Sequence, residues 1–285
     1  MKRLIDTAAR GGGHLLALCQ CFEDLFKPVL SGQAAHLGFT LAEVLVTLGI
    51  IGVVVALTLP ALVNNTQNKE IQTQFKKLYS ELNQASRLFM NDFGVSVTEY
   101  CRDKGTSSFV RTLLPKYLKG LKLYDDTTSG SKDEEGNAKS SAYQMYTLGG
   151  AKLRLGPCDD FGYMTDIAGR IYSFEYNGIT DEQQGPVVCI DVNGHKRPNK
   201  FGYDIFIFRF VENGLVLPMG QEYKAGESSY GFARDGASNN FFSKNECKVS
   251  SDLTNQLTCA KYALADVHPF EKGKNYWQDF LGKNR

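Results

Sequence analysis

The stretch that decides the fold is Phe39–Val63, which reads FTLAEVLVTLGIIGVVVALTLPALV. It contains one charged side chain, Glu43, and no Lys, Arg, Asn or Gln. About 20 apolar residues, each rising 1.5 Å, cross a hydrocarbon core of roughly 30 Å. The run therefore predicts a membrane-spanning helix. A buried helix of a soluble domain is disfavoured, because such a helix rarely stays apolar on every face over this length.

The helical pattern continues beyond Val63 but becomes amphipathic. Apolar residues recur at steps of three and four from Ile71 to Phe93, and charged residues occupy the positions between them. This periodicity predicts a helix with one stripe packed against a core. A coiled coil is disfavoured, because strict heptads are not sustained over three repeats. We expect a near-continuous helix over 39–93, with a membrane half over 39–63 and an amphipathic half beyond it.

Short segments rich in β-branched and aromatic residues follow later in the chain. They are bounded by Gly or Asn, as is typical of strands joined by turns, and comprise Ala151–Leu155, Arg170–Tyr176, Pro186–Val192, Tyr203–Val211 and Leu215–Pro218. Ile205–Phe208 is apolar enough for the centre of a sheet, and Asn213–Gly214 predicts a two-residue hairpin turn. The expected fold is α+β, with the long N-terminal helix packed on an antiparallel sheet in a head over 94–285.

The remaining segments of the head predict helices and loops. Phe109–Leu121 reads as a short helix interrupted at Pro115, and Leu257–Ala265 as a second short helix. Asp125–Ser141 has no large apolar residue and predicts an exposed loop, and the Gly-, Ser- and Asn-rich region Gly220–Asn245 predicts another.

Composition limits the function classes. The chain has 285 residues with 32 Lys plus Arg and 31 Asp plus Glu, so its formal net charge is +1. A dedicated nucleic-acid binder would show a basic excess, so no nucleic-acid site is expected. The hydrophobic fraction of 42% is too high for a disordered chain.

The motif in front of the apolar run carries a resemblance. Gly38-Phe39-Thr40-Leu41-Ala42-Glu43 resembles the cleavage motif of the type IV pilin and type II secretion pseudopilin family, and the resemblance extends over residues 38–93. It implies that residues 1–38 are a leader, that a prepilin peptidase cuts between Gly38 and Phe39, and that the new amine of Phe39 is methylated. In this leader the nearest basic residue to Gly38 is Lys27, whereas leaders of the family usually end with a basic residue close to the glycine.

Glu43 is the residue that a plain membrane anchor does not need. A carboxylate in an apolar helix is costly in lipid, so it is read as functional, with a partner. The resemblance implies that this partner is the positively charged N-terminal amine of a neighbouring subunit. The alternative is that Glu43, being close to the helix start, reaches the membrane interface and is tolerated there.

The cysteines beyond the apolar run would form disulfides if the head lies on an oxidising, extracytoplasmic side. Of the seven, two precede Gly38 and five follow it, namely Cys101, Cys158, Cys189, Cys247 and Cys259. The odd number leaves at least one thiol free or paired between chains. Cys247 and Cys259, twelve residues apart and flanked by loop residues, are the favoured pair. Buried thiols without a bond are the alternative.

One loop offers ligands for a cation. Asp191, Asn193, Asn199 and Asp204 are hard oxygen donors close together in sequence, and calcium takes six to eight oxygens. Some pseudopilins have a calcium-binding loop in the head. The favoured alternative is a structural connection, in which Asn193-Gly194 makes a tight turn and Asp191 accepts backbone amides. No other cofactor is expected.

The residues favour a structural role over an enzymatic one. The motifs G-x-S-x-G, G-x-G-x-x-G and H-E-x-x-H are absent, and only His195 and His268 follow Gly38. The resemblance implies a subunit, a minor pilin or pseudopilin, of a type IV pilus or type II secretion pseudopilus. Its implied partners are other such subunits, the prepilin peptidase, the assembly platform and the membrane. Its implied location is the inner membrane, single-pass, with the head in the periplasm or on an extracellular filament. The alternative is a single-pass protein with a ligand-binding periplasmic head that does not polymerise.

Overall fold

The computed structural model describes residues 40–128, 130–175, 186–221 and 247–283. The chain divides into two compact units, Met1–Val55 and Ala56–Arg285. Helix α2, Leu41–Phe93, contributes to both units and has 53 residues. As the sequence indicates, the first part of the helix is apolar on all sides and the second part is amphipathic.

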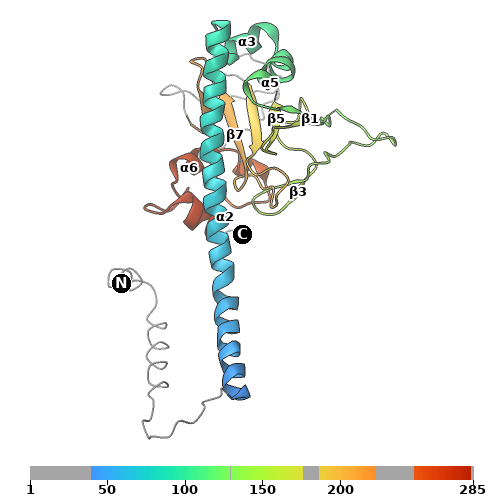
Figure 1. Ribbon diagram of the computed structural model, residues 1–285. Coiled ribbons are helices and arrows are strands. Elements are labelled where there is room, and N and C mark those ends of the chain that lie inside the picture. The colour runs from blue at the N-terminus through green and yellow to red at the C-terminus, as the bar shows by residue number, and fades with distance from the viewer. Residues whose placement is uncertain (1–39, 129, 176–185, 222–246, 284–285) are drawn as a thin grey trace. The chain divides into compact units, whose positions relative to one another are not determined.

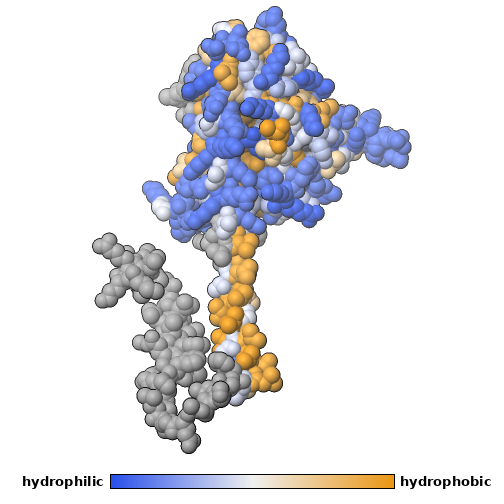
Figure 2. Space-filling model, viewed as in Figure 1, coloured by the Kyte–Doolittle hydropathy of each residue, from blue (hydrophilic) through white to orange (hydrophobic). Residues whose placement is uncertain are grey.

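The first unit is helical in its described part. The stretch Leu41–Leu59 is long and apolar enough to cross a membrane, and no part of it is buried. It is the one stretch among the described residues that meets this test. Figure 2 shows its side chains as a mostly hydrophobic surface. A helix that is apolar on all sides without protein packing on it is suited to lipid as its surroundings.

The second unit is built on an antiparallel sheet. Six strands lie in the order β1-β4-β5-β6-β7-β8, with bounds Lys122–Asp125, Tyr163–Thr165, Ile171–Glu175, Val187–Asp191, Ile205–Phe210 and Val216–Pro218. Every neighbouring pair is antiparallel. A second, two-stranded sheet pairs β2, Met145–Tyr146, with β3, Lys152–Leu153.

The amphipathic part of α2 covers one face of this sheet, as Figure 1 shows. Most of its apolar stripe is buried, although Leu88 and Phe93 are exposed. The Phe75 ring meets Phe206 at 4.6 Å and Phe208 at 5.6 Å between ring centroids. Successive strand residues alternate between two cores. Phe206 and Phe208 belong to the core under α2, whereas Ile205 and Ile207 belong to a second core on the other face.

Short helices complete the head. After α2 come α3, Val97–Lys104, then α4, Thr106–Ser108, η2, Phe109–Leu113, and α5, Leu114–Tyr117. The C-terminal part carries η3, Leu253–Asn255, α6, Cys259–Ala265, η4, Tyr276–Phe280, and η5, Leu281–Lys283. Ser96 and Glu99 cap the start of α3 reciprocally, so the chain turns sharply after α2 and begins a new helix.

The structure differs from the sequence-based expectation in four places. β1 and β4 were not expected, and Ala151–Leu155 contributes only the two residues of β3, to the small sheet. β7 is buried along its whole length but lies second from the edge. The hairpin at Gly214 is longer than two residues, because Val211 still pairs with Leu215. Most of the expected loop at 220–245 lies outside the described residues.

Candidate functional site

The start of α2 holds the expected processing and assembly residues. Gly38 and Phe39 lie outside the described residues, so cleavage between them stays a prediction. Thr40 and Glu43 are described and bind each other. The Thr40 N–H and hydroxyl donate to Glu43 Oε2 at 2.9 and 2.8 Å, and the Glu43 N–H donates to Thr40 Oγ1 at 3.2 Å. This is a capping box, whose T-x-x-E spacing the sequence interpretation overlooked.

The capping box gives Glu43 a partner inside its own chain. The carboxylate accepts two hydrogen bonds at the helix start, where the free backbone N–H groups favour negative charge. This lowers the cost of holding a carboxylate in an apolar segment. Pairing with a neighbouring subunit would therefore compete with an existing pair of bonds from Thr40.

Two disulfides join parts of the head. Cys247–Cys259 is the pair that the sequence favours, and the second bond joins Cys158 to Cys189. The remaining cysteine among the described residues, Cys101, is free and buried. Burial raises the pKa of its thiol to about 12. The second pair was missed because Cys158 and Cys189 are 31 residues apart in sequence, and only the fold brings Cys158 to β6.

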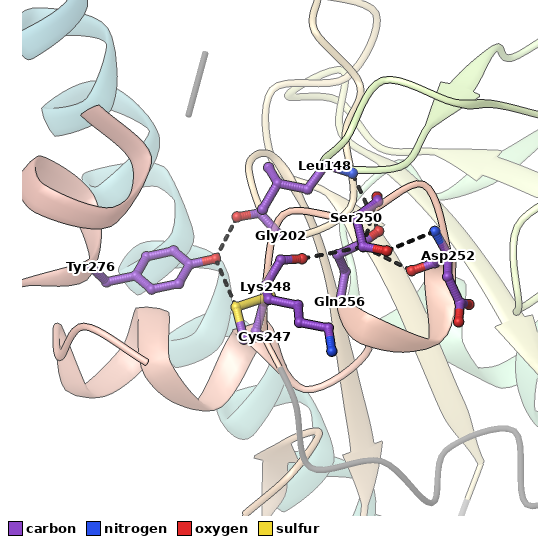
Figure 3. The surroundings of a disulfide bond; sticks show 9 residues. Leu148, Gly202, Cys247, Lys248, Ser250, Asp252, Gln256 and Tyr276 are labelled. Carbon is purple, nitrogen blue, oxygen red and sulfur yellow. Dashed lines mark hydrogen bonds between the residues drawn. A yellow bond between two sulfur atoms is a disulfide. The ribbon is translucent and has the colours of Figure 1, made fainter. Parts of the chain in front are cut away.

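The surroundings of Cys247–Cys259 tie the C-terminal segment to the rest of the head (Figure 3). The Tyr276 hydroxyl donates to the Gly202 carbonyl and lies 3.8 Å from Cys247 Sγ. Gly202 has φ of 81°, and a Cβ there would lie 2.9 Å from Cys259 Sγ. Gln256 adds a second tie, because its side-chain oxygen accepts from the Leu148 N–H at 3.2 Å. The disulfide thus adds a covalent link to a region that these hydrogen bonds also hold together.

The loop between β6 and β7 brings two expected cation ligands together. Asp191, at the end of β6, is fully buried. Its Oδ1 accepts from the N–H groups of Asn193 and Gly194 at 2.9 and 2.8 Å, and its Oδ2 accepts from the Tyr143 hydroxyl. The two backbone donors bend the chain into the tight turn expected at Asn193-Gly194, and the Tyr143 hydroxyl holds the carboxylate from a distant part of the chain.

Asp204 performs the same task at the other end of this loop. It is fully buried, and its carboxylate accepts from the Asn199 and Lys200 N–H groups at 2.9 and 2.5 Å. The Asn193 side chain also donates to it. Burial raises the pKa of Asp204 to about 7, although these hydrogen bonds act in the opposite direction. Burial, followed by the charge of nearby Asp204, raises the pKa of Asp191 well above its ordinary value.

The four expected calcium ligands therefore have unequal roles. The two carboxylates brace the loop, and each oxygen of both already accepts a hydrogen bond. Asn199 donates from its amide nitrogen to the Gln144 carbonyl at 3.1 Å. Within the described part of the chain, the side-chain oxygens of Asn193 and Asn199 are buried without a hydrogen-bond partner. This arrangement suits a turn held by two buried, hydrogen-bonded carboxyl groups.

Comparison with known proteins adds no family to this picture: no family model, curated protein or solved structure matches the chain. The functional interpretation therefore rests on the residues themselves.

Proposed function

We propose that this chain is a pilin-like structural subunit, a minor pilin or pseudopilin, that assembles through its apolar helix. The observation that carries the proposal is one carboxylate, Glu43, at the start of an otherwise apolar stretch that no protein covers. A simple anchor does not need this charge, whereas a helix that packs against copies of itself can use it to set register. The motif Gly38–Glu43 adds a cleavage site directly in front of that helix.

In this proposal the leader is removed in the inner membrane and the apolar helix then moves from lipid into a filament core. The prepilin peptidase, the assembly platform and neighbouring subunits are the partners. Cleavage creates an ammonium on Phe39, and pairing that ammonium with a neighbour's Glu43 offsets a desolvation cost of several kcal/mol. The disulfides fit heads that work in an oxidising compartment.

Cleavage is tested first. We expect mass spectrometry of the membrane protein from its own host to show a chain that begins at a methylated Phe39. A Gly38→Val variant should keep residues 1–38, because a side chain at this position would crowd the peptidase site. A wild-type protein that keeps its leader in the mature form would remove the basis of the proposal.

Assembly is tested at Glu43 with two variants. Glu43→Val removes both the charge and the capping box, whereas Glu43→Gln removes the charge but keeps a residue that can complete the box. If the carboxylate pairs with a neighbour's amine, both variants insert into membranes and both are depleted from sheared filaments. Normal incorporation of Glu43→Gln would show that Glu43 serves only to cap its own helix.

A ligand-binding head on a non-polymerising anchor is the second candidate, and a small cleft beside α2 with charged side chains on both sides favours it. The same fractionation separates the two. A filament subunit is found in the sheared-filament fraction. An anchored receptor remains entirely in the membrane fraction, whether or not its leader is cleaved.

A further inference from the structure

A small cleft lies between α2 and the segment 193–203 that joins β6 to β7. Its volume of about 120 Å³ is well below the ~300–1,000 Å³ of pockets for drug-sized ligands. Charged and amide side chains line it from both sides together with Ile71 and Tyr203, the polar ones being Gln67, Glu70, Gln74, Asn193, Lys196 and Arg197. Its size and the charged side chains along it suit a small charged group.

The two sides of the cleft carry opposite charges. Glu70 stands on α2, and Lys196 and Arg197 stand on the facing segment. Lys196 Nζ lies 3.9 Å from Glu70 Oε1, and their side chains are 74% and 55% exposed. An ion pair this exposed adds little stability, so a ligand that offers both charges can replace it at little cost. The matching ligand is a zwitterion.

Two side-chain amide oxygens of the cleft receive no hydrogen bond from the described residues. Gln74 donates from its amide nitrogen to Glu70 at 3.1 Å, and Asn193 donates to Asp204. These bonds fix which end of each amide is the nitrogen. The oxygens that remain, Gln74 Oε1 and Asn193 Oδ1, are buried and have no hydrogen-bond partner among the described residues. They add negative potential to the cleft, which favours a cation that carries N–H groups.

The position of the cleft along α2 suits a membrane surface. Gln67 lies four residues beyond Val63, the last residue of the apolar run, which is about 6 Å along a helix axis. The headgroup layer of a bilayer is about 5–8 Å thick on each side. With Val63 at the edge of the hydrocarbon, Gln67 lies within this layer and Glu70, about 10 Å beyond Val63, lies at its outer edge, so the cleft opens where headgroups meet water.

We propose that this cleft binds a phosphoethanolamine group. The ammonium lies toward Glu70 and the two amide oxygens, and the phosphate lies toward Lys196 and Arg197, whose guanidinium can bind two phosphate oxygens at once. A bilayer lipid and a soluble phosphoethanolamine ester both offer this chemistry. The lipid source rests on the membrane location in the proposed function, whereas the soluble source does not.

The lipid source is tested with the full chain in detergent by native mass spectrometry, using equal amounts of phosphatidylethanolamine and phosphatidylcholine. We expect roughly tenfold preferential retention of phosphatidylethanolamine, because a trimethylammonium has no N–H to donate. Glu70→Gln should abolish this preference, and Arg197→Ala should reduce retention of both lipids. Lys69→Ala, an exposed neighbour on α2 that does not line the cleft, is the matched control.

The soluble source is tested by adding glycerophosphoethanolamine to the same protein. A rise in melting temperature that Glu70→Gln removes, without selective retention of the lipid, would assign the cleft to a soluble ligand. Equal retention of both lipids together with an unchanged melting temperature would overturn the inference. Neither result depends on cleavage at Gly38 or on filament incorporation, so failure here is distinguishable from failure of the proposed function.

Discussion

At the scale of single residues, Asp204 makes the stability of the head decrease as the pH rises, whereas a carboxylate with a lowered pKa has the opposite effect. Its pKa in the folded protein, about 7, exceeds the value of about 3.9 in an unfolded chain. Between these values the folded state binds more protons, so its contribution to stability is present at low pH and is lost as the pH rises toward 7. Asp191 acts in the same direction. Carboxylates whose pKa is lowered in the folded protein, such as Asp125, contribute stability that increases with pH and so oppose this effect.

We therefore compare the wild type with Asp204→Asn in urea unfolding at pH 5 and pH 7.5. The wild type should lose stability by up to about 1 kcal/mol per pH unit relative to the variant over this range. The variant should be less stable at pH 5, because an amide nitrogen cannot accept from the Asn199 or Lys200 N–H group, whereas both oxygens of the protonated wild-type carboxyl group can. Parallel pH profiles for the two proteins would show that Asp204 keeps an ordinary pKa.

Adding calcium tests whether a cation binds to the carboxyl groups of Asp191 and Asp204. We expect millimolar calcium to leave the melting temperature unchanged, because the carboxylate oxygens of Asp191 and Asp204 already accept hydrogen bonds. Binding to the folded state would raise the melting temperature by mass action. A rise that Asp191→Ala abolishes would restore the calcium site that the sequence suggests.

At the scale of elements, one side chain of α2 closes an edge of the sheet. β8 is an edge strand, and Asn83 binds its Val216 as a neighbouring strand would. Asn83 Oδ1 accepts from the Val216 N–H at 3.0 Å, and its amide donates to the Val216 carbonyl at 3.2 Å. Asn83→Ala should lower the free energy of unfolding by about 1–3 kcal/mol, because both groups of a buried residue lose their partner.

Chemical denaturation measures this loss, and Gln84→Ala provides the control. Gln84 is exposed on the next position of α2 and binds only Ser80 of the same helix, so its loss should fall within about 0.5 kcal/mol. Equal losses for the two variants would mean that the contact with β8 does not hold the helix on the sheet.

Elements with strong local patterns could be predicted from the sequence, and those fixed by distant contacts could not. The stripe from Ile71 to Phe93 and the apolar strands β5 to β7 carry their own periodicity, so α2 and the core of the sheet were foreseen. β1 has the exposed pattern of an edge strand and forms because β4 pairs with it. The roles of Asp191 and Asp204 as loop braces follow from burial, which spacing alone does not reveal.

At the scale of the whole molecule, the two disulfides constrain the unfolded chain to different extents. They close loops with sequence separations of 12 for Cys247–Cys259 and 31 for Cys158–Cys189. In the chain-entropy model the longer loop loses more freedom, so the stabilisation is ~3 kcal/mol for the shorter and nearly 1 kcal/mol more for the longer. Replacing both cysteines of a pair by Ser should reproduce this order.

Urea unfolding of the full chain, purified without reductant, measures both losses. Cys101→Ser serves as the reference for placing a hydroxyl at a buried cysteine position, because Cys101 forms no disulfide. The Cys247→Ser/Cys259→Ser variant also tests the packing around Tyr276, whose contact with Gly202 should survive the loss of the bond. If so, the variant stays folded with lower stability. Two results would place this head in a reducing compartment. One is a double variant that loses less stability than Cys101→Ser. The other is a wild type in which all five thiols beyond Gly38 react with maleimide after denaturation.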